Sequence, residues 1–363
     1  MNCFLEKLQS KNFRNLSSEM LHFGPKINCI FGENGNGKTN ILELIHFITN
    51  SKSFRKNAKF NQILNTGSED GEIQVQVAFN KDKEIIYISG KIFEKQQFWY
   101  QNNTELKKIK ITNSIFINPF DSNQFHNTSS FRRSMFDNLI GVLFPEYKRI
   151  INQYESILRS RNKILASQKI DIDYLNAYQE KFENYNYQIT FFRKEFIAQL
   201  NEFITETFNK IFSEQHFLEI RLTSKIRDLN HEEVAKFIRS NREKEITRRI
   251  TYYGVHRDDY VFHFDGFNSY EYCSLGQQKM AYLSLLFAYI ELFRYKFNFY
   301  PIVLIDDVSG ELDSVRWSKL IQYLEGCKFQ TFITTANEAF KCELEKINSA
   351  KKIYINDGSS YIR

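Results

Sequence analysis

A glycine-rich pattern near the N-terminus constrains the fold of this chain more than any other feature. Residues 32–39 read Gly32, Glu33, Asn34, Gly35, Asn36, Gly37, Lys38 and Thr39, and they fit the pattern G-x-x-x-x-G-K-[ST]. An apolar run over 27–31 precedes this loop, and a helical pattern over 40–48 follows it. A strand, a glycine loop and a helix in this order predict an α/β unit whose loop lies at the carboxyl end of a buried strand.

The residue types in this loop suit ATP with Mg²⁺. Glycines allow backbone N–H groups to close around phosphate oxygens, and the N-terminus of the following helix adds partial positive charge. We expect Lys38 to bridge the β- and γ-phosphates and Thr39 to offer its hydroxyl to Mg²⁺. The alternative is an ordinary glycine-rich turn, which the flanking strand and helix make the weaker interpretation.

A second apolar strand ends in two acids. Residues 301–307 read Pro-Ile-Val-Leu-Ile-Asp-Asp, and such a continuous apolar run is typical of a strand that is buried on both faces. We predict that Asp306 holds Mg²⁺, directly or through water, and that Asp307 orients or deprotonates the attacking water. Alone the pattern is weak, because paired acids often just begin a solvated loop. Beside the glycine loop, the functional interpretation is favoured.

A third element opens the apolar helix expected over 279–293. Ser274, Gly276 and Gln277 stand at its start, roughly thirty residues before Asp306. A serine cap and a glycine at a helix N-terminus expose N–H groups to an anion. Taken alone, this element is more simply a helix cap.

Composition limits the class of protein. The 363 residues carry a net charge of +6, with 42% hydrophobic and 25% charged residues, which is typical of a globular chain and excludes disorder. The charge leaves room for a local basic face without requiring a nucleic-acid partner. Five cysteines without a C-x-x-C pair make a disulfide framework or a zinc site improbable. No apolar run approaches the roughly 18 residues of a membrane span, so we expect no membrane partner and a cytoplasmic protein.

The hydrophobic period changes along the chain. From Tyr147 to Ile204 apolar residues recur at helical spacing, and α/β character returns at Thr251. We therefore predict one α/β lobe from residues 1–140 and 245–363 together, and a mainly helical second lobe over 141–244.

The three elements, followed by residues 309–313 (Ser-Gly-Glu-Leu-Asp), resemble the ABC-type ATPase heads of SMC proteins. Within that group the chain is most similar to the RecF family of bacterial recombination mediators. Stretches that carry this closer resemblance include 12–16 (NFRNL), 131–133 (FRR), 161–165 (RNKIL) and 254–259 (GVHRDD). The resemblance implies an α/β P-loop ATPase head of the ABC/SMC type, with a mixed sheet and flanking helices, plus the mainly helical second lobe.

The same resemblance implies how the site is completed. Two heads sandwich ATP, and the P-loop of one chain faces Ser274, Gly276 and Gln277 of the other. Asp313 then lies near the opposing nucleotide, and Arg14 and Arg55 add positive charge at the phosphates.

Two positions depart from the wider superfamily. Asp307 replaces the usual Glu, and Thr335 stands where a switch histidine is common. A Q-loop glutamine is also hard to place. These departures favour a slow, switch-like ATPase.

The implied activity is that of a weak DNA-dependent ATPase. It forms an ATP-gated homodimeric clamp on DNA that helps to load recombinase at single-strand gaps, with RecO and RecR as partners. Without an aromatic-plus-basic base-reading motif, DNA binding should follow duplex or junction shape. The candidate phosphate contacts, each weak on its own, are Lys107, Lys108, Lys110, Arg132, Arg133, Arg159, Arg161, Lys163, Arg248 and Arg249.

Two other functions remain open at this point. One is the energising subunit of a transporter or nuclease machine, which would need a coupling surface or a further acid-rich domain that the sequence does not display. The other is a nucleotide-binding scaffold without turnover.

Overall fold

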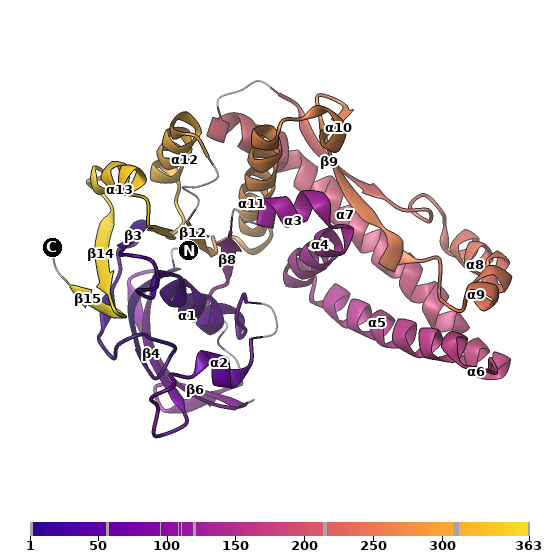
Figure 1. The fold of residues 1–363 in the computed structure, drawn as a ribbon, viewed down its shortest axis with the longest axis horizontal. Coiled ribbons are helices and arrows are strands. Elements are labelled where there is room, and N and C mark those ends of the chain that lie inside the picture. Colours follow the sequence, from indigo (N-terminus) through magenta and orange to yellow (C-terminus); the bar gives the residue numbers. More distant parts are fainter. Residues whose placement is uncertain are drawn as a thin grey trace. The chain divides into compact units, whose positions relative to one another are not determined.

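The chain forms two compact units, each assembled from separate segments of sequence. The computed structural model describes residues 3–55, 58–94, 96–107, 109, 111–118, 121–212, 216–307 and 312–361. The first unit comprises residues 1–120, 210–213 and 293–363, and the second comprises 121–209 and 214–292. Figure 1 shows the course of the chain and labels many of the helices and strands.

The first unit contains two sheets. Within the described residues the antiparallel sheet has six strands in the order β2-β1-β4-β5-β6-β7, and the other, mainly parallel sheet has the order β15-β14-β3-β13-β12-β8. The antiparallel strands are β1 (Cys3–Lys11), β2 (Leu21–His22), β4 (Ile73–Lys81), β5 (Glu84–Phe93), β6 (Gln96–Gln101) and β7 (Thr104–Leu106). The other strands are β3 (Ile27–Phe31), β8 (Ser114–Ile117), β12 (Ile302–Asp306), β13 (Thr331–Thr335), β14 (Lys351–Asn356) and β15 (Ser359–Tyr361).

Strand β3 lies inside the parallel part of its sheet. It pairs in parallel with β13 on one side and β14 on the other, and all five of its residues are buried. One hydrophobic core joins the two sheets to helix α1 (Lys38–Asn50), with Leu5, Val77, Ile41 and Leu304 among its members. The helices α2 (Phe60–Ile63), α12 (Ser314–Gly326) and α13 (Glu338–Glu345) complete this unit.

The second unit is mainly helical but includes a small sheet. Its described strands follow the order β11-β10-β9, namely β9 (Leu218–Thr223), β10 (Asp259–Phe264) and β11 (Phe267–Asn268). Its helices are α3 (Asp121–Asn127), α4 (Ser129–Leu143), α5 (Pro145–Ala166), α6 (Ile172–Ala177), α7 (Gln179–Phe212), α8 (His231–Ser240), α9 (Arg242–Arg248), α10 (Ser269–Tyr272) and α11 (Leu275–Phe297), with a 3₁₀ turn over Val255–Arg257. The last residues of α7 (210–212) and of α11 (293–297) belong to the first unit.

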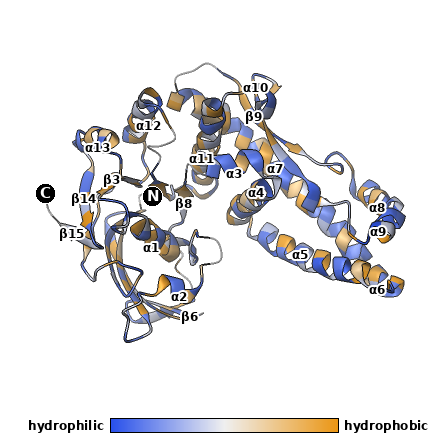
Figure 2. Ribbon diagram, viewed as in Figure 1, coloured by the Kyte–Doolittle hydropathy of each residue, from blue (hydrophilic) through white to orange (hydrophobic). Residues whose placement is uncertain are grey.

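Apolar residues form buried stripes along the long helices of this unit. On α5 the buried positions include Tyr147, Ile150, Tyr154 and Ile157, which is the helical spacing that the sequence displays. Figure 2 shows hydrophilic and hydrophobic residues interspersed along α5 and α7. Among the described helices, none is both long enough and apolar enough to span a membrane.

The division of the chain differs from the predicted boundaries. Residues 121–140 and 245–292 belong to the second unit and not to the α/β lobe. The reason is strand pairing, since β10 pairs along its length with β9 and thereby ties the segment after residue 245 to the middle of the chain. The second unit therefore also contains Ser274, Gly276 and Gln277.

Candidate nucleotide-binding site

The predicted P-loop connects β3 to α1 in the first unit. Gly35 and Gly37 adopt φ angles of 88° and 98°, in the left-handed region that favours glycine. Gly32 packs so tightly that an added Cβ would lie 2.4 Å from the carbonyl oxygen of Ile355, whereas a Cβ on Gly35 would meet nothing within 4 Å. The loop is therefore fixed against the sheet at its first glycine and open at its middle glycine.

Residues distant in sequence hold this loop. The Asn15 side chain donates to the carbonyl oxygen of Gly35 at 3.0 Å and accepts from the Asn40 amide at 2.7 Å. The N–H of Gly358, in the turn between β14 and β15, donates to the carbonyl oxygen of Asn36 at 3.1 Å. Asn15 lies in the RecF-like stretch 12–16, but no local sequence pattern predicts a role for it or for Gly358.

Lys38 is almost fully buried, with 8% of its surface exposed. Its ammonium donates to the carbonyl oxygens of Gly32 and Glu33 at 2.7 and 2.8 Å. Burial lowers the pKa of Lys38, and the negative charges of Asp307, Asp306 and Glu33 oppose that shift. The predicted P-loop lysine and both predicted acids thus lie within electrostatic reach of one another.

Thr39 and Asp306 meet directly. The Thr39 hydroxyl lies 3.0 Å from each carboxylate oxygen of Asp306, and the Thr334 hydroxyl donates to Asp306 Oδ1 at 2.6 Å. Burial raises the pKa of Asp306, and the hydrogen bonds from Thr334 and Thr39 act against this rise. Because a nearby cation would favour the ionised carboxylate, this cluster of hydroxyl and carboxylate oxygens suits a hard divalent metal.

Asp307 follows directly after β12. It has a φ of 45°, a conformation that few non-glycine residues adopt, and its N–H donates to the backbone oxygen and to the hydroxyl of Thr334, each at 3.2 Å. Such strain often accompanies functional sites. Thr335 is buried at the end of β13, where its hydroxyl accepts the N–H of Asn337 at 3.1 Å.

Arg14 and Arg55, predicted to lie at the phosphates, converge on the carboxylate of Glu43. Glu43 of α1 is fully buried and accepts from Arg14 at 2.5 and 2.8 Å, while Arg55 Nε lies 3.3 Å from it. Arg14 also donates to the backbone of Gln62, so its guanidinium is committed to structure. Arg55 donates to Asn40 at 2.8 Å, one residue beyond Thr39. An acid inside the apolar run of α1 is the sequence signal for this ion-pair cluster.

Replacing Glu43 with glutamine should destabilise the first unit by about 3 kcal/mol, because it leaves two arginines beside a neutral group in a buried position. Both tryptophans of the chain, Trp99 and Trp317, are buried in this unit, so their fluorescence during urea unfolding is a direct measurement. The matched control is Glu84→Gln, at an exposed strand position. Equal unfolding midpoints for both variants would show that the cluster contributes little.

In the second unit, Ser274 caps α11. The Ser274 hydroxyl accepts the N–H of Gln277 at 3.3 Å, and the Gln277 side chain accepts the N–H of Ser274 at 2.9 Å, which is the reciprocal arrangement of a capping box. Ser274 is exposed, and Gly276 is partly exposed. The simpler prediction of a helix cap is thus correct, and the same residues still present a helix N-terminus to solvent.

Asp313 is also a helix cap. Its carboxylate accepts the N–H of Arg316 at 2.9 Å and pairs with the Arg316 guanidinium at 2.7 Å. Residues 309–311 of the predicted D-loop lie outside the described residues, and Leu312 is buried.

The predicted DNA contacts fall into buried and exposed groups. Arg132 is buried in a two-bond ion pair with Asp259, and Arg161 is buried against Glu245 at 2.9 Å. Arg133 is partly buried and donates to the backbone of Asp258. Lys108 and Lys110 lie outside the described residues. The exposed candidates are Lys107, Arg159, Lys163, Arg248 and Arg249.

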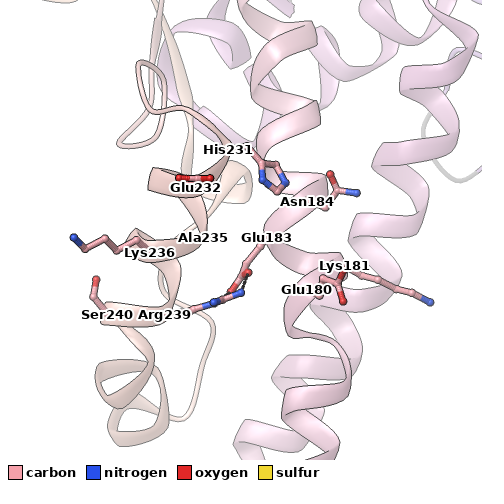
Figure 3. Close-up of a pocket in the computed structure, with 10 residues that line it drawn as sticks. All are labelled: Glu180, Lys181, Glu183, Asn184, His231, Glu232, Ala235, Lys236, Arg239 and Ser240. Atoms are coloured by element: carbon pink, nitrogen blue, oxygen red, sulfur yellow. Dashed lines mark hydrogen bonds and ion pairs between the residues drawn. The ribbon is translucent and has the colours of Figure 1, made fainter.

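One cavity of the second unit is unrelated to these motifs. It has a volume of about 1080 Å³ between α7 and α8, and its lining contains three acids and three bases. Glu183 and Arg239 pair across it at 2.7 Å, and Figure 3 shows Lys181 and Lys236 extending away from each other. Balanced charge gives this cavity no preference for an anionic ligand.

Together the fold and the site define a P-loop ATPase head of the ABC/SMC type. The family model for the RecF/RecN/SMC N-terminal domain matches residues 4–359. The chain is 30% identical over 368 residues to the DNA replication and repair protein RecF of Staphylococcus carnosus, with 98% of each covered, and 30% identical over 370 residues to that of Listeria monocytogenes, again with 98% of each covered. The chain therefore belongs to the RecF family.

Solved structures agree with this assignment. The recombination mediator protein RecF bound to ATP, described as part of the RecFOR pathway, matches 99% of both chains with a TM-score of 0.80 and 25% identity. An SMC head domain from Pyrococcus furiosus covers 99% of this chain and 96% of its own, with a TM-score of 0.56 and 15% identity. The second match shows only the shared fold.

Proposed function

We propose that this chain is an ATP-dependent DNA-binding protein of recombinational repair and replication, with slow ATP hydrolysis. One observation carries the proposal: the oxygens of Thr39 and Asp306 meet at 3.0 Å behind a P-loop, in a chain that is similar over 98% of its length to DNA replication and repair proteins named RecF. ATP as the nucleotide is supported by the ATP-bound relative.

The P-loop residues 32–39 fit a triphosphate. The open side of Gly35 allows backbone N–H groups to approach phosphate oxygens closely. The ammonium of Lys38 supplies positive charge to the β- and γ-phosphates at the N-terminus of α1. Arg55 interacts electrostatically with Asp306, so its guanidinium adds positive charge near the phosphates. Arg14 instead pairs with Glu43 and has a structural role.

Thr39 and Asp306 are the proposed ligands of Mg²⁺. Mg²⁺ binds oxygen at about 2.1 Å in octahedral geometry, so that adjacent ligand oxygens lie about 3 Å apart, as these two groups do. When bound, Mg²⁺ neutralises charge on the phosphates. Thr334 keeps the Asp306 carboxylate oriented through its 2.6 Å hydrogen bond.

Asp307 is the proposed water-orienting group. The negative charge of Asp307 opposes the lowering of the Lys38 pKa. We therefore place its carboxylate near the γ-phosphate that Lys38 would bind. Replacing it with asparagine should lower ATP turnover about 100-fold or more, because general-base assistance is lost, while ATP binding and ATP-driven dimerisation persist. Steady-state phosphate release measures the first effect and sedimentation the second.

The matched control is Asp82→Asn, at another first-unit aspartate with a positive φ, here 51°. It should leave turnover unchanged. If Asp307→Asn also hydrolyses ATP at the normal rate, Asp307 has no catalytic role and another group orients the water.

The remaining site residues act between two chains in this proposal. Ser274, Gly276 and Gln277 present the N-terminus of α11 to the γ-phosphate that is bound to the P-loop of a second copy. Asp313 lies at the same interface. The resulting homodimer encloses DNA without reading its sequence, and RecO and RecR are the proposed protein partners in loading recombinase.

Gel-shift assays test this function on gapped, duplex and single-stranded DNA, each with ATP, with ADP and without nucleotide. We expect ATP to tighten binding to duplex and gapped DNA. We also expect affinity to fall steeply with salt, because the exposed cations Lys107, Arg159 and Lys163 are the proposed phosphate contacts. Equal binding in all three nucleotide states would contradict an ATP-gated clamp.

A further inference from the structure

A smaller cavity in the second unit combines aromatic walls with positive charge. It has a volume of about 340 Å³ and is formed by the end of β9, by Phe237 of α8 and by the segment that follows α9. Tyr252 and Tyr253 form part of its wall, and Lys225 and Arg257 also line it. Its volume is at the lower end of ordinary ligand pockets, which suits one nucleotide and excludes a duplex.

The aromatic rings of this cavity pack edge to face. The centroids of Tyr252 and Tyr253 are 4.9 Å apart with an interplanar angle of 80°, and Phe237 lies 5.2 Å from Tyr253 at 78°. In such an arrangement the edge of one ring supports the next. Tyr253 is held by rings on two sides, which is the kind of rigid surface on which a planar ligand stacks.

Three cations surround these tyrosines. The Arg248 guanidinium lies 4.2 Å from the centroid of the Tyr252 ring and that of Arg257 lies 5.6 Å from it, while Lys225 Nζ lies 5.0 Å from the centroid of Tyr253. A hydrogen bond with Arg248 and the nearby positive charges lower the pKa of the Tyr252 phenol, which supports a positive local field.

The acids around this cavity are already neutralised. Asp258 is the one acid among the lining residues, and its carboxylate is buried and pairs with Arg193 at 2.7 Å. Glu245, beneath the tyrosine segment, pairs with Arg161. The three cations therefore leave a net positive charge at an aromatic surface, whereas the larger cavity between α7 and α8 is balanced.

Polar side chains fix the segment that carries the tyrosines. Glu245 accepts the N–H of Tyr252 at 3.0 Å, Asn162 accepts the N–H of Thr251 at 2.8 Å, and Asn186 accepts the N–H of Val255 at 2.9 Å. Gly254 adopts a φ of 139°, and a Cβ there would lie 2.7 Å from the Asn186 side-chain oxygen. The segment is thus anchored along its length before any ligand arrives.

This anchoring gives a structural role to two RecF-like stretches, 161–165 and 254–259, that contribute nothing to the ATP site. Arg161 and Asn162 belong to the RNKIL stretch, and Gly254 opens the GVHRDD stretch. Arg161, predicted as a DNA contact, is a positioning residue here: it holds Glu245, and Glu245 holds the backbone of Tyr252.

We propose that this cavity binds one unpaired base of single-stranded DNA, stacked on the ring of Tyr253 with Tyr252 against its edge, while Arg248, Arg257 and Lys225 contact the adjoining phosphates. Aromatic faces joined to cations are the usual means of holding unpaired bases without sequence preference. The inference rests on the proposed function and specifies which part of a gapped substrate this unit recognises. The sequence displays no aromatic-plus-basic base-reading motif, and the fold brings aromatic and basic side chains together from residues 225 to 257.

The test compares the full chain with a Tyr252→Leu, Tyr253→Leu double variant, in the presence of ATP. The probes are a duplex with a short single-stranded gap and a continuous duplex of equal length. Loss of stacking should weaken binding to gapped DNA about 5- to 150-fold and leave binding to the continuous duplex unchanged. The matched control is Tyr174→Leu, at an exposed tyrosine of α6 that is 55% accessible and has the acid Asp171 nearby.

Photocrosslinking gives a second measurement that needs no substitution. Gapped DNA carrying 5-iododeoxyuridine in the gap is irradiated with the unaltered protein, and we expect crosslinked peptides that contain Tyr252 or Tyr253. Crosslinks confined to other segments, together with an unchanged preference of the double variant for gapped DNA, would overturn the inference and leave the proposed function standing. If the unaltered chain binds neither DNA, the proposed function itself fails.

Discussion

Replacing Lys38 with alanine should abolish ATP-driven dimerisation and lower ATP turnover about 100- to 1000-fold. Lys38 is the buried cation of the P-loop, with its ammonium within 2.8 Å of two loop carbonyls. Without the Lys38 ammonium, no P-loop cation neutralises the charge of the β- and γ-phosphates. ATP is then held poorly, and the proposed interface between two chains, which includes ATP, does not form. Sedimentation velocity with and without ATP measures the first effect, and phosphate release measures the second.

The matched control is Lys83→Ala, at an exposed position next to β5. It should dimerise and hydrolyse ATP normally. Unchanged tryptophan fluorescence in Lys38→Ala would show that the first unit is still folded. Dimerisation of Lys38→Ala to the same extent as the unaltered chain would exclude the P-loop from the interface.

Replacing Ser274 with arginine should leave ATP binding to the monomer intact and prevent the ATP-driven dimer. The reason is that Ser274 caps α11 and, in the proposed dimer, faces the phosphate that the P-loop of the other chain holds. A bulky side chain at the helix N-terminus blocks the close approach of a phosphate that another chain carries. Filter binding of labelled ATP measures monomer binding, and sedimentation measures the dimer.

A second variant separates capping from phosphate contact. Ser274→Asp keeps a good cap but places a negative charge against the phosphate, so it should also block the dimer at normal thermal stability. The neutral control is Ser134→Arg, at an exposed serine of α4, which should dimerise normally. Loss of monomer ATP binding in Ser274→Arg would show that the element works within a single chain.

The sequence predicts the strands and the helix around the P-loop well, because each of them depends on the residue pattern within its own segment. The apolar run at 27–31, the glycines and the helix starting near Lys38 occur at the expected positions, as does the strand ending at Asp306. The small sheet of the second unit is missed. Strand β9 is short and alternates, and its place depends on pairing with β10, a contact between distant segments that local periodicity does not reveal.

The roles of the arginines are harder to predict from sequence than the positions of the helices and strands. Arg132, Arg161 and Arg14 have partners that are far away in sequence: Asp259, Glu245 and Glu43. A run of basic residues does not distinguish a solvated arginine from one buried in an ion pair, because that choice depends on where an acid lies after folding. Glu43 itself is a visible signal, since an acid between apolar residues of a buried helix requires a partner.

The pairing of β3 has a consequence for biosynthesis. Asn28 on β3 donates to the backbone of Thr331, 303 positions later in the chain, and β14 flanks the other edge. While a ribosome is still adding the residues in between, this apolar strand has neither neighbour. The P-loop after β3 is thus among the last parts of the molecule to reach its final structure. A polypeptide halted before β13 would expose β3 as an unpaired hydrophobic strand, which chaperones bind, and would not bind nucleotide.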